Sequence, residues 1–162
     1  MNKPTLAATT AVAAAAGIGS LASRPRATSW YSRLNKPSYV PPNAVFPVAW
    51  TSLYIDIAAT SAAAIDRLRA AERHGAEREA RNYAIALGVN LILNAGWSWL
   101  FFSCHKLGAS TVGAAVLAAS SADLTRRTAR ANPRAGAALL PYPLWSAFAT
   151  AMSSHIWVLN RS

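Results

Sequence analysis

Long stretches with few or no charged side chains divide the sequence, and they restrict its fold more than any other feature. A helix needs about 20 mainly apolar residues to cross the hydrocarbon core of a bilayer. The stretches that approach or exceed this length are residues 5–22, 44–65, 83–104, 107–122 and 136–159. The sequence therefore predicts an all-α membrane protein, a bundle of five transmembrane helices with the lipid bilayer as its surroundings.

Charge and composition exclude other classes of protein. Only 14% of the 162 residues are charged and 53% are hydrophobic, whereas a soluble domain carries about 25% charged residues. The net charge of +10 comes from basic residues clustered between the apolar stretches, which argues against a nucleic-acid-binding fold. A single cysteine, Cys104, excludes an intramolecular disulfide and a multi-cysteine metal site. Because the five stretches use nearly the whole chain, we expect one domain over residues 1–162 and no nucleic-acid partner.

Two of the stretches are weaker than the others as membrane spans. Residues 5–22 follow Lys3 and are rich in alanine, which also fits a cleavable signal peptide that would leave a bundle of four helices. Residues 107–122 are short and rich in small side chains. Such a span would need support from its neighbours.

The segments between the stretches differ in their expected structure. Residues 24–43 contain four prolines, so we expect an extended loop rather than a helix. Residues 66–82 carry charges of both signs, and we expect them to extend the two neighbouring helices into water. Residues 124–135 carry four arginines and are expected to form a loop.

Aromatic and amide side chains recur at three- and four-residue steps in three of the stretches, and this spacing places each set on one helix face. The three faces consist of Phe46, Trp50, Tyr54 and Ile57; of Asn90, Asn94, Trp97 and Phe101; and of Tyr142, Trp145, Ala149, Met152 and Ile156. Polar groups at membrane depth normally face the bundle interior. Each Asn taken alone fits a hydrogen bond to a neighbouring helix equally well. Three such faces together favour a pocket for a flat, largely apolar ligand with a few polar groups.

A row of small residues lies on the opposite side of the third stretch. Ala84, Gly88 and Ala95 share this face, and small residues let helix backbones approach closely. The row predicts either a dimer interface or packing within the bundle. The sequence shows no paired carboxylates, phosphate-binding loop or metal-ligand spacing, and we expect no metal site.

Several sequence blocks resemble a single membrane-protein family, the TspO/MBR family of bacterial tryptophan-rich sensory proteins and the mitochondrial translocator protein (peripheral-type benzodiazepine receptor). The resemblance covers residues 30–160. The blocks are residues 30–37 (WYSRLNKP) with 41–42 (PP), residues 46–54 (FPVAWTSLY), residues 93–97 (LNAGW) with 101–102 (FF), and residues 140–142 (LPY) with Trp145.

The resemblance implies a bundle of five transmembrane helices, commonly a homodimer, that binds tetrapyrroles such as protoporphyrin IX or haem-type ligands. The protein would act as a sensor, scavenger, transporter or receptor. Its alanine- and arginine-rich composition suggests a bacterial cell membrane as its location. The porphyrin is the ligand, and no cofactor is required. Positions that match the family cavity are Trp50, Tyr54, Asn94, Trp97, Trp145 and Ala149. The ligand-binding residues that we expect are Phe46, Trp50, Tyr54, Asn90, Asn94, Trp97, Tyr142, Trp145 and Ala149.

Two other functions stay open at this point. The resemblance also implies a light-dependent porphyrin-degrading enzyme, in which Trp50 and Trp145 would be the catalytic residues. The small-residue face around Gly88 could instead bind another membrane protein. The family's cholesterol-recognition motif needs Leu, Tyr and a basic residue near the end of the last helix. Met152 and Val158 stand in this region, so a sterol partner is not expected.

Overall fold

The computed structural model describes residues 10, 12–14, 25–72 and 74–161. Every element in this part of the chain is a helix, which confirms the predicted all-α class. The elements are α2 (Pro25–Ser32), α3 (Val45–Arg69), α4 (Ala76–Phe102), α5 (Leu107–Ala131), α6 (Pro133–Ala138) and α7 (Pro141–Leu159). Of the first predicted span, residues 5–22, only residues 10 and 12–14 are described, and they are helical. The rest of that span, with its signal-peptide alternative, lies outside the described residues.

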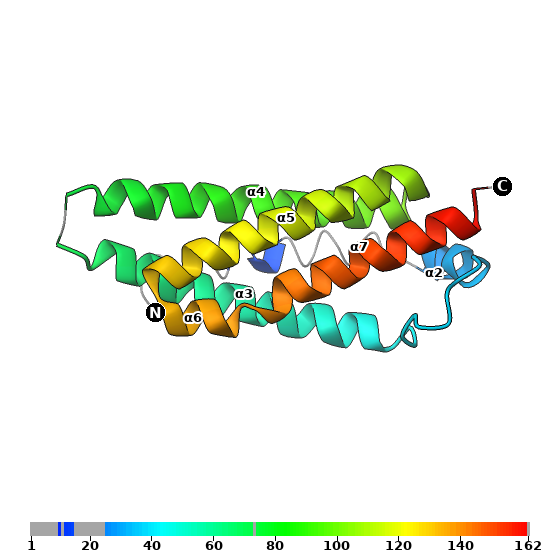
Figure 1. The fold of residues 1–162 in the computed structure, drawn as a ribbon, viewed down its shortest axis with the longest axis horizontal. Helices are drawn as coiled ribbons and strands as arrows, with labels where there is room; N and C mark the ends of the chain where they lie inside the picture. The colour runs from blue at the N-terminus through cyan, green and yellow to red at the C-terminus, as the bar shows by residue number, and fades with distance from the viewer. Residues whose placement is uncertain (1–9, 11, 15–24, 73, 162) are drawn as a thin grey trace.

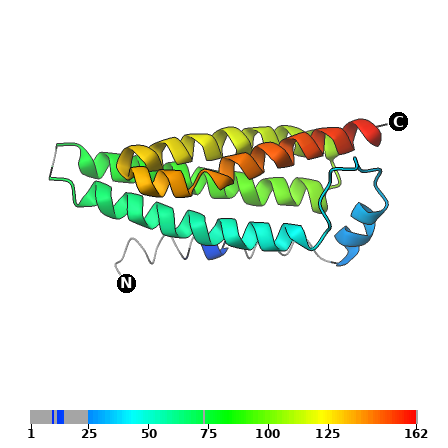
Figure 2. The same ribbon diagram turned by 60° about the horizontal axis from the view of Figure 1, so that its bottom comes forward.

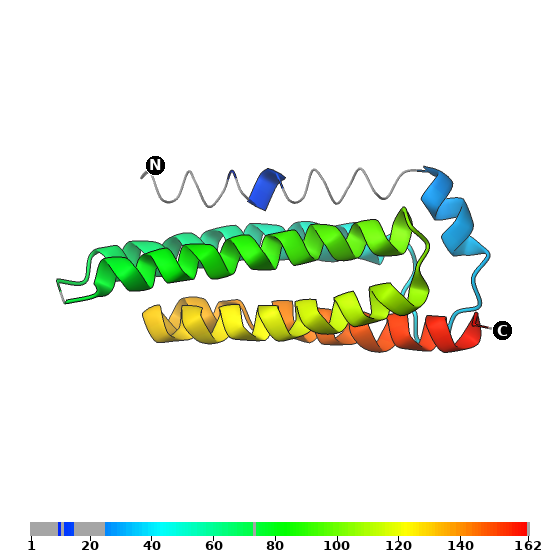
Figure 3. The same ribbon diagram turned by 90° about the horizontal axis from the view of Figure 1, so that it is seen from above.

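The long helices run lengthwise beside one another as a bundle (Figure 1). Two layers are visible when the bundle is turned: α3 and α4 form one, and α5 lies with α6 and α7 in the other (Figure 3). Figure 2 shows α6 and α7 following each other along the bundle. The short helix α2 lies across the end of the bundle at which α7 ends. The polar and aromatic side chains of α3, α4 and α7 can therefore meet between the two layers.

The helices α3, α4 and α5 are long and apolar enough to cross a membrane. The last helix, α7, contains 19 residues and is about 28 Å long at 1.5 Å per residue, close to the thickness of the hydrocarbon core. The prediction of membrane-spanning helices is therefore confirmed, and the count of five stays a prediction.

The fifth predicted span, residues 136–159, is not one continuous helix. It is divided between α6 and α7. Pro141 has no N–H to donate, and in a continuous helix its ring would clash with the carbonyl oxygen four residues earlier. At the break, Leu140 N donates to Ala137 O at 3.3 Å and Tyr142 N donates to Leu139 O at 3.1 Å. Both hydrogen bonds join residues three apart rather than four, so the backbone forms a tight turn here. α7 then begins with Pro141 in its first turn.

Two segments predicted as loops are helical over part of their length. α2 begins at Pro25, and a proline at the first helical position loses no hydrogen bond. The remaining prolines, including Pro37 and Pro41, lie in residues 33–44, which are non-helical as expected. α5 continues to Ala131 instead of ending near residue 122. Within this extension Asp123 forms ion pairs with Arg126 and Arg127 at helical spacing, so the charges are compatible with a helix.

A buried polar contact joins three of the helices. The hydroxyl of Tyr83 on α4 donates to Ser61 Oγ on α3 at 3.1 Å. It also lies 2.8 Å from Thr128 Oγ1 on α5. All three side chains are buried. This contact fixes α4 between its neighbours at the end of the bundle near the α3–α4 connection.

Candidate functional site

Aromatic rings from α3, α4 and α7 gather in what we call the aromatic cluster: Phe46, Trp50, Tyr54, Trp97 and Trp145. The ring centroids of Trp50 and Trp97 are 6.0 Å apart, and those of Trp50 and Tyr54 are 5.8 Å apart. Phe46 meets Trp145 edge-on at 6.1 Å. These separations are typical of aromatic pairs. The structure therefore brings the three predicted faces together.

The amide side chains of α4 form a chain of hydrogen bonds across the bundle, which we call the amide–tyrosine chain. The Tyr54 hydroxyl donates to Asn94 Oδ1 at 2.7 Å, and Asn94 Nδ2 donates to the Tyr142 hydroxyl at 3.3 Å. The Tyr142 hydroxyl donates to Asn90 Oδ1 at 2.8 Å, and Asn90 Nδ2 donates to Ser120 Oγ at 3.1 Å. Each member donates to the next, so the chain has one direction from α3 to α5. Such chains polarise their members cooperatively.

Two indole groups of the aromatic cluster carry polar atoms that the protein does not use. Trp97 Nε1 and Trp145 Nε1 are buried and have no hydrogen-bond partner in the described part of the chain. Leaving a buried donor unsatisfied costs about 1–3 kcal/mol, and buried polar groups in folded proteins normally have a partner. Both N–H groups are therefore unused donors in the described part of the protein.

The predicted ligand-binding residues differ in how deeply they are buried. Asn90, Asn94 and Tyr142 are fully buried, and Trp97 and Ala149 are nearly so. The half-buried members are Phe46, Trp50, Tyr54 and Trp145. Trp50 contacts the rings of Tyr54 and Trp97, and Trp145 contacts the rings of Phe46 and Phe148. No ring contact between Trp50 and Trp145 is present in the described part of the structure. The role of these residues in binding stays a prediction.

The loop before α3 is joined to α7 through residues that the sequence analysis did not select. The Tyr39 hydroxyl lies 3.0 Å from His155 Nδ1, and the Tyr39 ring meets Phe148 at 6.1 Å. Phe148 in turn packs on Trp145, with centroids 5.6 Å apart. Spacing could have indicated Phe148 and His155, because both lie on the same side of α7. The loop therefore reaches the aromatic cluster through two rings.

A second contact holds the same loop at the end of α7. Asn160 Oδ1 accepts from Asn35 N at 3.0 Å, and Asn160 Nδ2 donates to Asn35 O at 2.8 Å. The Lys36 ammonium donates to Tyr31 O at 2.7 Å and lies 4.6 Å from the centre of the Tyr31 ring. Burial raises the pKa of the Tyr31 hydroxyl. The loop is thus fastened to both α2 and α7.

Sequence reasoning also missed the polar residues that complete these networks. Tyr83 precedes Asn90 by seven residues, so it continues the predicted face of α4; this signal could have identified it. Ser120 lies in a stretch rich in small residues and gives no comparable signal. The predicted interface residues point elsewhere: Ala84 is exposed, Gly88 and Ala95 are half-buried, and a Cβ added at Gly88 would have nothing within 4 Å.

Comparisons with known proteins agree with this architecture. The chain is 34% identical to protein CrtK of Rhodobacter capsulatus over 132 residues, 82% of this chain and 79% of the relative. It is 31% identical to the tryptophan-rich protein TspO of Chlorobaculum tepidum, over 99% of both chains. It is 30% identical to the human translocator protein, over 82% of this chain and 75% of the relative.

The family comparison covers nearly the whole sequence, because the TspO/MBR family profile matches residues 7–158. With its apolar helices the chain is an integral membrane protein, and the bacterial relatives support a bacterial membrane as its location. The chain belongs to the TspO/MBR family.

Proposed function

We propose that this protein binds a tetrapyrrole such as protoporphyrin IX at the aromatic cluster and acts as a sensor, scavenger or transporter. The observation that carries the proposal is the pair of buried, unpartnered indole N–H groups of Trp97 and Trp145. They belong to a cluster of rings contributed by three helices. The relatives named as sensory and translocator proteins agree with these roles.

The chemistry of the cluster suits an aromatic macrocycle with polar substituents. Large flat rings gain dispersion and electrostatic energy by stacking or edge contact with Trp and Tyr. The indole N–H groups can donate to acceptor atoms of the macrocycle or of its propionates. Because the Tyr54 proton is used on Asn94, the Tyr54 oxygen is left to accept from a pyrrole N–H.

A titration of the purified protein in detergent with protoporphyrin IX, followed by Trp fluorescence quenching, tests the proposal. The double variant Trp50→Ala/Trp145→Ala should bind at least tenfold more weakly, since each lost ring contact with a flat ligand removes about 1–3 kcal/mol. Trp157→Ala is the control, because Trp157 lies on α7 with Trp145 but is exposed. It should keep the affinity of the parent protein.

An unchanged affinity in the double variant would overturn the assignment of the ligand to this cluster. The same complex addresses the enzymatic alternative. If illumination makes the porphyrin spectrum decay faster than it does with denatured protein, light-dependent breakdown is favoured over binding alone.

A further inference from the structure

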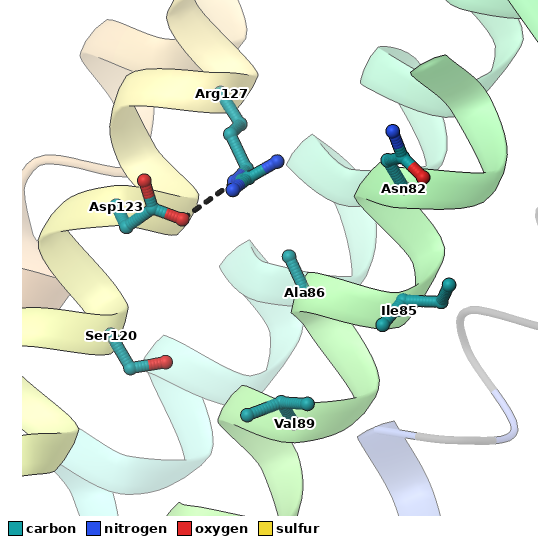
Figure 4. A pocket seen from close by; sticks show the side chains of 7 residues that line it. All are labelled: Asn82, Ile85, Ala86, Val89, Ser120, Asp123 and Arg127. Atoms are coloured by element: carbon teal, nitrogen blue, oxygen red, sulfur yellow. Dashed lines mark hydrogen bonds and ion pairs between the residues drawn. The ribbon is translucent and has the colours of Figure 1, made fainter. Parts of the chain in front are cut away.

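A pocket lies between α4 and α5 and shares no residue with the aromatic cluster. Its volume is about 410 Å³, within the range of small-molecule sites. Figure 4 shows side chains from both helices around it. The lining residues are Asn82, Ile85, Ala86, Val89, Ser120, Asp123 and Arg127.

The pocket changes from polar to apolar along the bundle. Asn82 and Arg127 lie toward the end where α4 begins and α5 ends, whereas Val89 and Ser120 lie nearer the middle of both helices. Beyond the pocket the apolar surface continues, because Ile92 on α4 and Val116 on α5 are exposed. An occupant with a polar head and an apolar tail fits this order.

The polar end of the pocket carries a surplus of positive charge. Asp123 is paired with both Arg126 and Arg127, which leaves one positive charge uncompensated. Arg127 Nε donates to Asp123 Oδ2 at 2.5 Å, as drawn in Figure 4. The terminal N–H groups of this guanidinium have no partner in the described part of the structure. They can therefore donate to an anionic group in the pocket.

The apolar end also contains an unused donor. Ser120 Oγ accepts the last hydrogen bond of the amide–tyrosine chain, from Asn90 Nδ2. Its own hydroxyl hydrogen has no acceptor among the described residues, and Ser120 lines the pocket. A neutral acceptor, such as an ester carbonyl, would complete this bond.

We propose that the pocket between α4 and α5 binds an anionic glycerophospholipid of the surrounding membrane. Arg127 donates to the phosphate, Ser120 donates to an ester carbonyl, and an acyl chain lies along Val89 toward Ile92. Since helical side chains lean toward the N-terminus of their helix, the guanidinium of Arg127 extends toward Ser120. Both contacts can then engage one lipid. The proposal does not depend on binding of a tetrapyrrole.

Lipid binding to the full-length protein, purified and stripped of lipid in detergent, can be measured by native mass spectrometry. Dioleoylphosphatidylglycerol should bind more tightly than dioleoylphosphatidylcholine, which has the same acyl chains and no net charge. The variant Arg127→Gln should lose about tenfold of the affinity for phosphatidylglycerol, the scale of one charge-assisted hydrogen bond. Arg126 remains to pair with Asp123 in this variant. Ser120→Ala should weaken both lipids by a similar factor.

Arg134→Gln is the matched control, because it removes the same charge from an exposed residue of α6 outside the pocket. An equal loss in this control would overturn the proposal in favour of general attraction between basic residues and lipid. Displacement of the lipid by millimolar inorganic phosphate would overturn the lipid assignment in favour of a phosphate site. Disulfide crosslinking of protomers through Val89→Cys, in a Cys104→Ser background, would show that a second copy covers the pocket and would also overturn the proposal.

Discussion

Asn94 has no exposed surface, yet both ends of its amide are hydrogen-bonded within the bundle. Its oxygen accepts from Tyr54 and its nitrogen donates to Tyr142. Asn90 uses its amide in the same way, between Tyr142 and Ser120. Since an unsatisfied amide is costly at membrane depth, these bonds determine how α3, α4, α5 and α7 sit against one another.

Removing the Tyr142 hydroxyl, at the centre of the amide–tyrosine chain, should destabilise the protein. In Tyr142→Phe, Asn94 Nδ2 loses its acceptor and Asn90 Oδ1 loses its donor. We expect a loss of about 1–2 kcal/mol in the free energy of unfolding, measured by dodecyl sulfate denaturation in mixed micelles. Tyr39→Phe is the control, because its hydroxyl is exposed and water can replace the lost contact. An equal loss of unfolding free energy in the two variants would contradict the structural importance of the amide–tyrosine chain.

The sequence predicted which residues share a face but not all of their partners. Helical spacing placed Asn90, Asn94 and Trp97 together, because a face depends only on 3.6 residues per turn. The position of Ser120 opposite Asn90 depends on the register between α4 and α5. Register is set by packing along the whole length of both helices, and no local pattern reports it. The same holds for Tyr83 and its partner on α5.

At the scale of helices, the prediction relied on charge and length, and it was wrong where charged residues continue a helix and where a proline divides an uncharged stretch. The arginines after residue 122 suggested a loop, but the ion pairs of Asp123 with Arg126 and Arg127 fit a continuing helix. Conversely, residues 136–159 lack charges and were expected to form one span. Pro141 divides them, because the missing N–H outweighs an apolar composition. A proline therefore limits a helix more strictly than a charge does.

The short helix α6 packs against α5 at a point that excludes any side chain. A Cβ added at Gly136 would overlap the backbone of Ala129, so Gly136→Ala should force the two helices apart. We expect a loss of about 1–3 kcal/mol in the free energy of unfolding, measured by the same denaturation. Gly96→Ala is the matched control, since a Cβ there meets nothing within 4 Å. This substitution should be neutral or stabilise by about 0.5–1 kcal/mol. A neutral Gly136→Ala would contradict the close packing of α6 on α5.

For the whole molecule, the exposed apolar side chains of α4 and α5 face outward from the bundle. Ile85, Ile92 and Val112 are among them, and an exposed surface of this kind is stable in contact with lipid or with another membrane protein. The buried polar contacts, by contrast, lie between helices. This distribution, polar inside and apolar outside, is the one that a bilayer requires. It leaves the outer face of α4 available for a second protomer.

We expect that face, formed by Ala84, Gly88 and Ala95, to be the interface of a homodimer. Gly88→Leu should abolish dimers in detergent and in bilayers, measured by chemical crosslinking and by single-molecule photobleaching. A Cβ at Gly88 meets nothing within 4 Å in the protomer, so a side chain at this position leaves the helix toward open space. We therefore expect leucine to act on the contact between protomers. Gly96→Leu is the control on the same helix. It lies about 80° around α4 from Gly88, has equally open surroundings, and should leave the dimer unchanged. Dimers that survive Gly88→Leu would place the interface on another face.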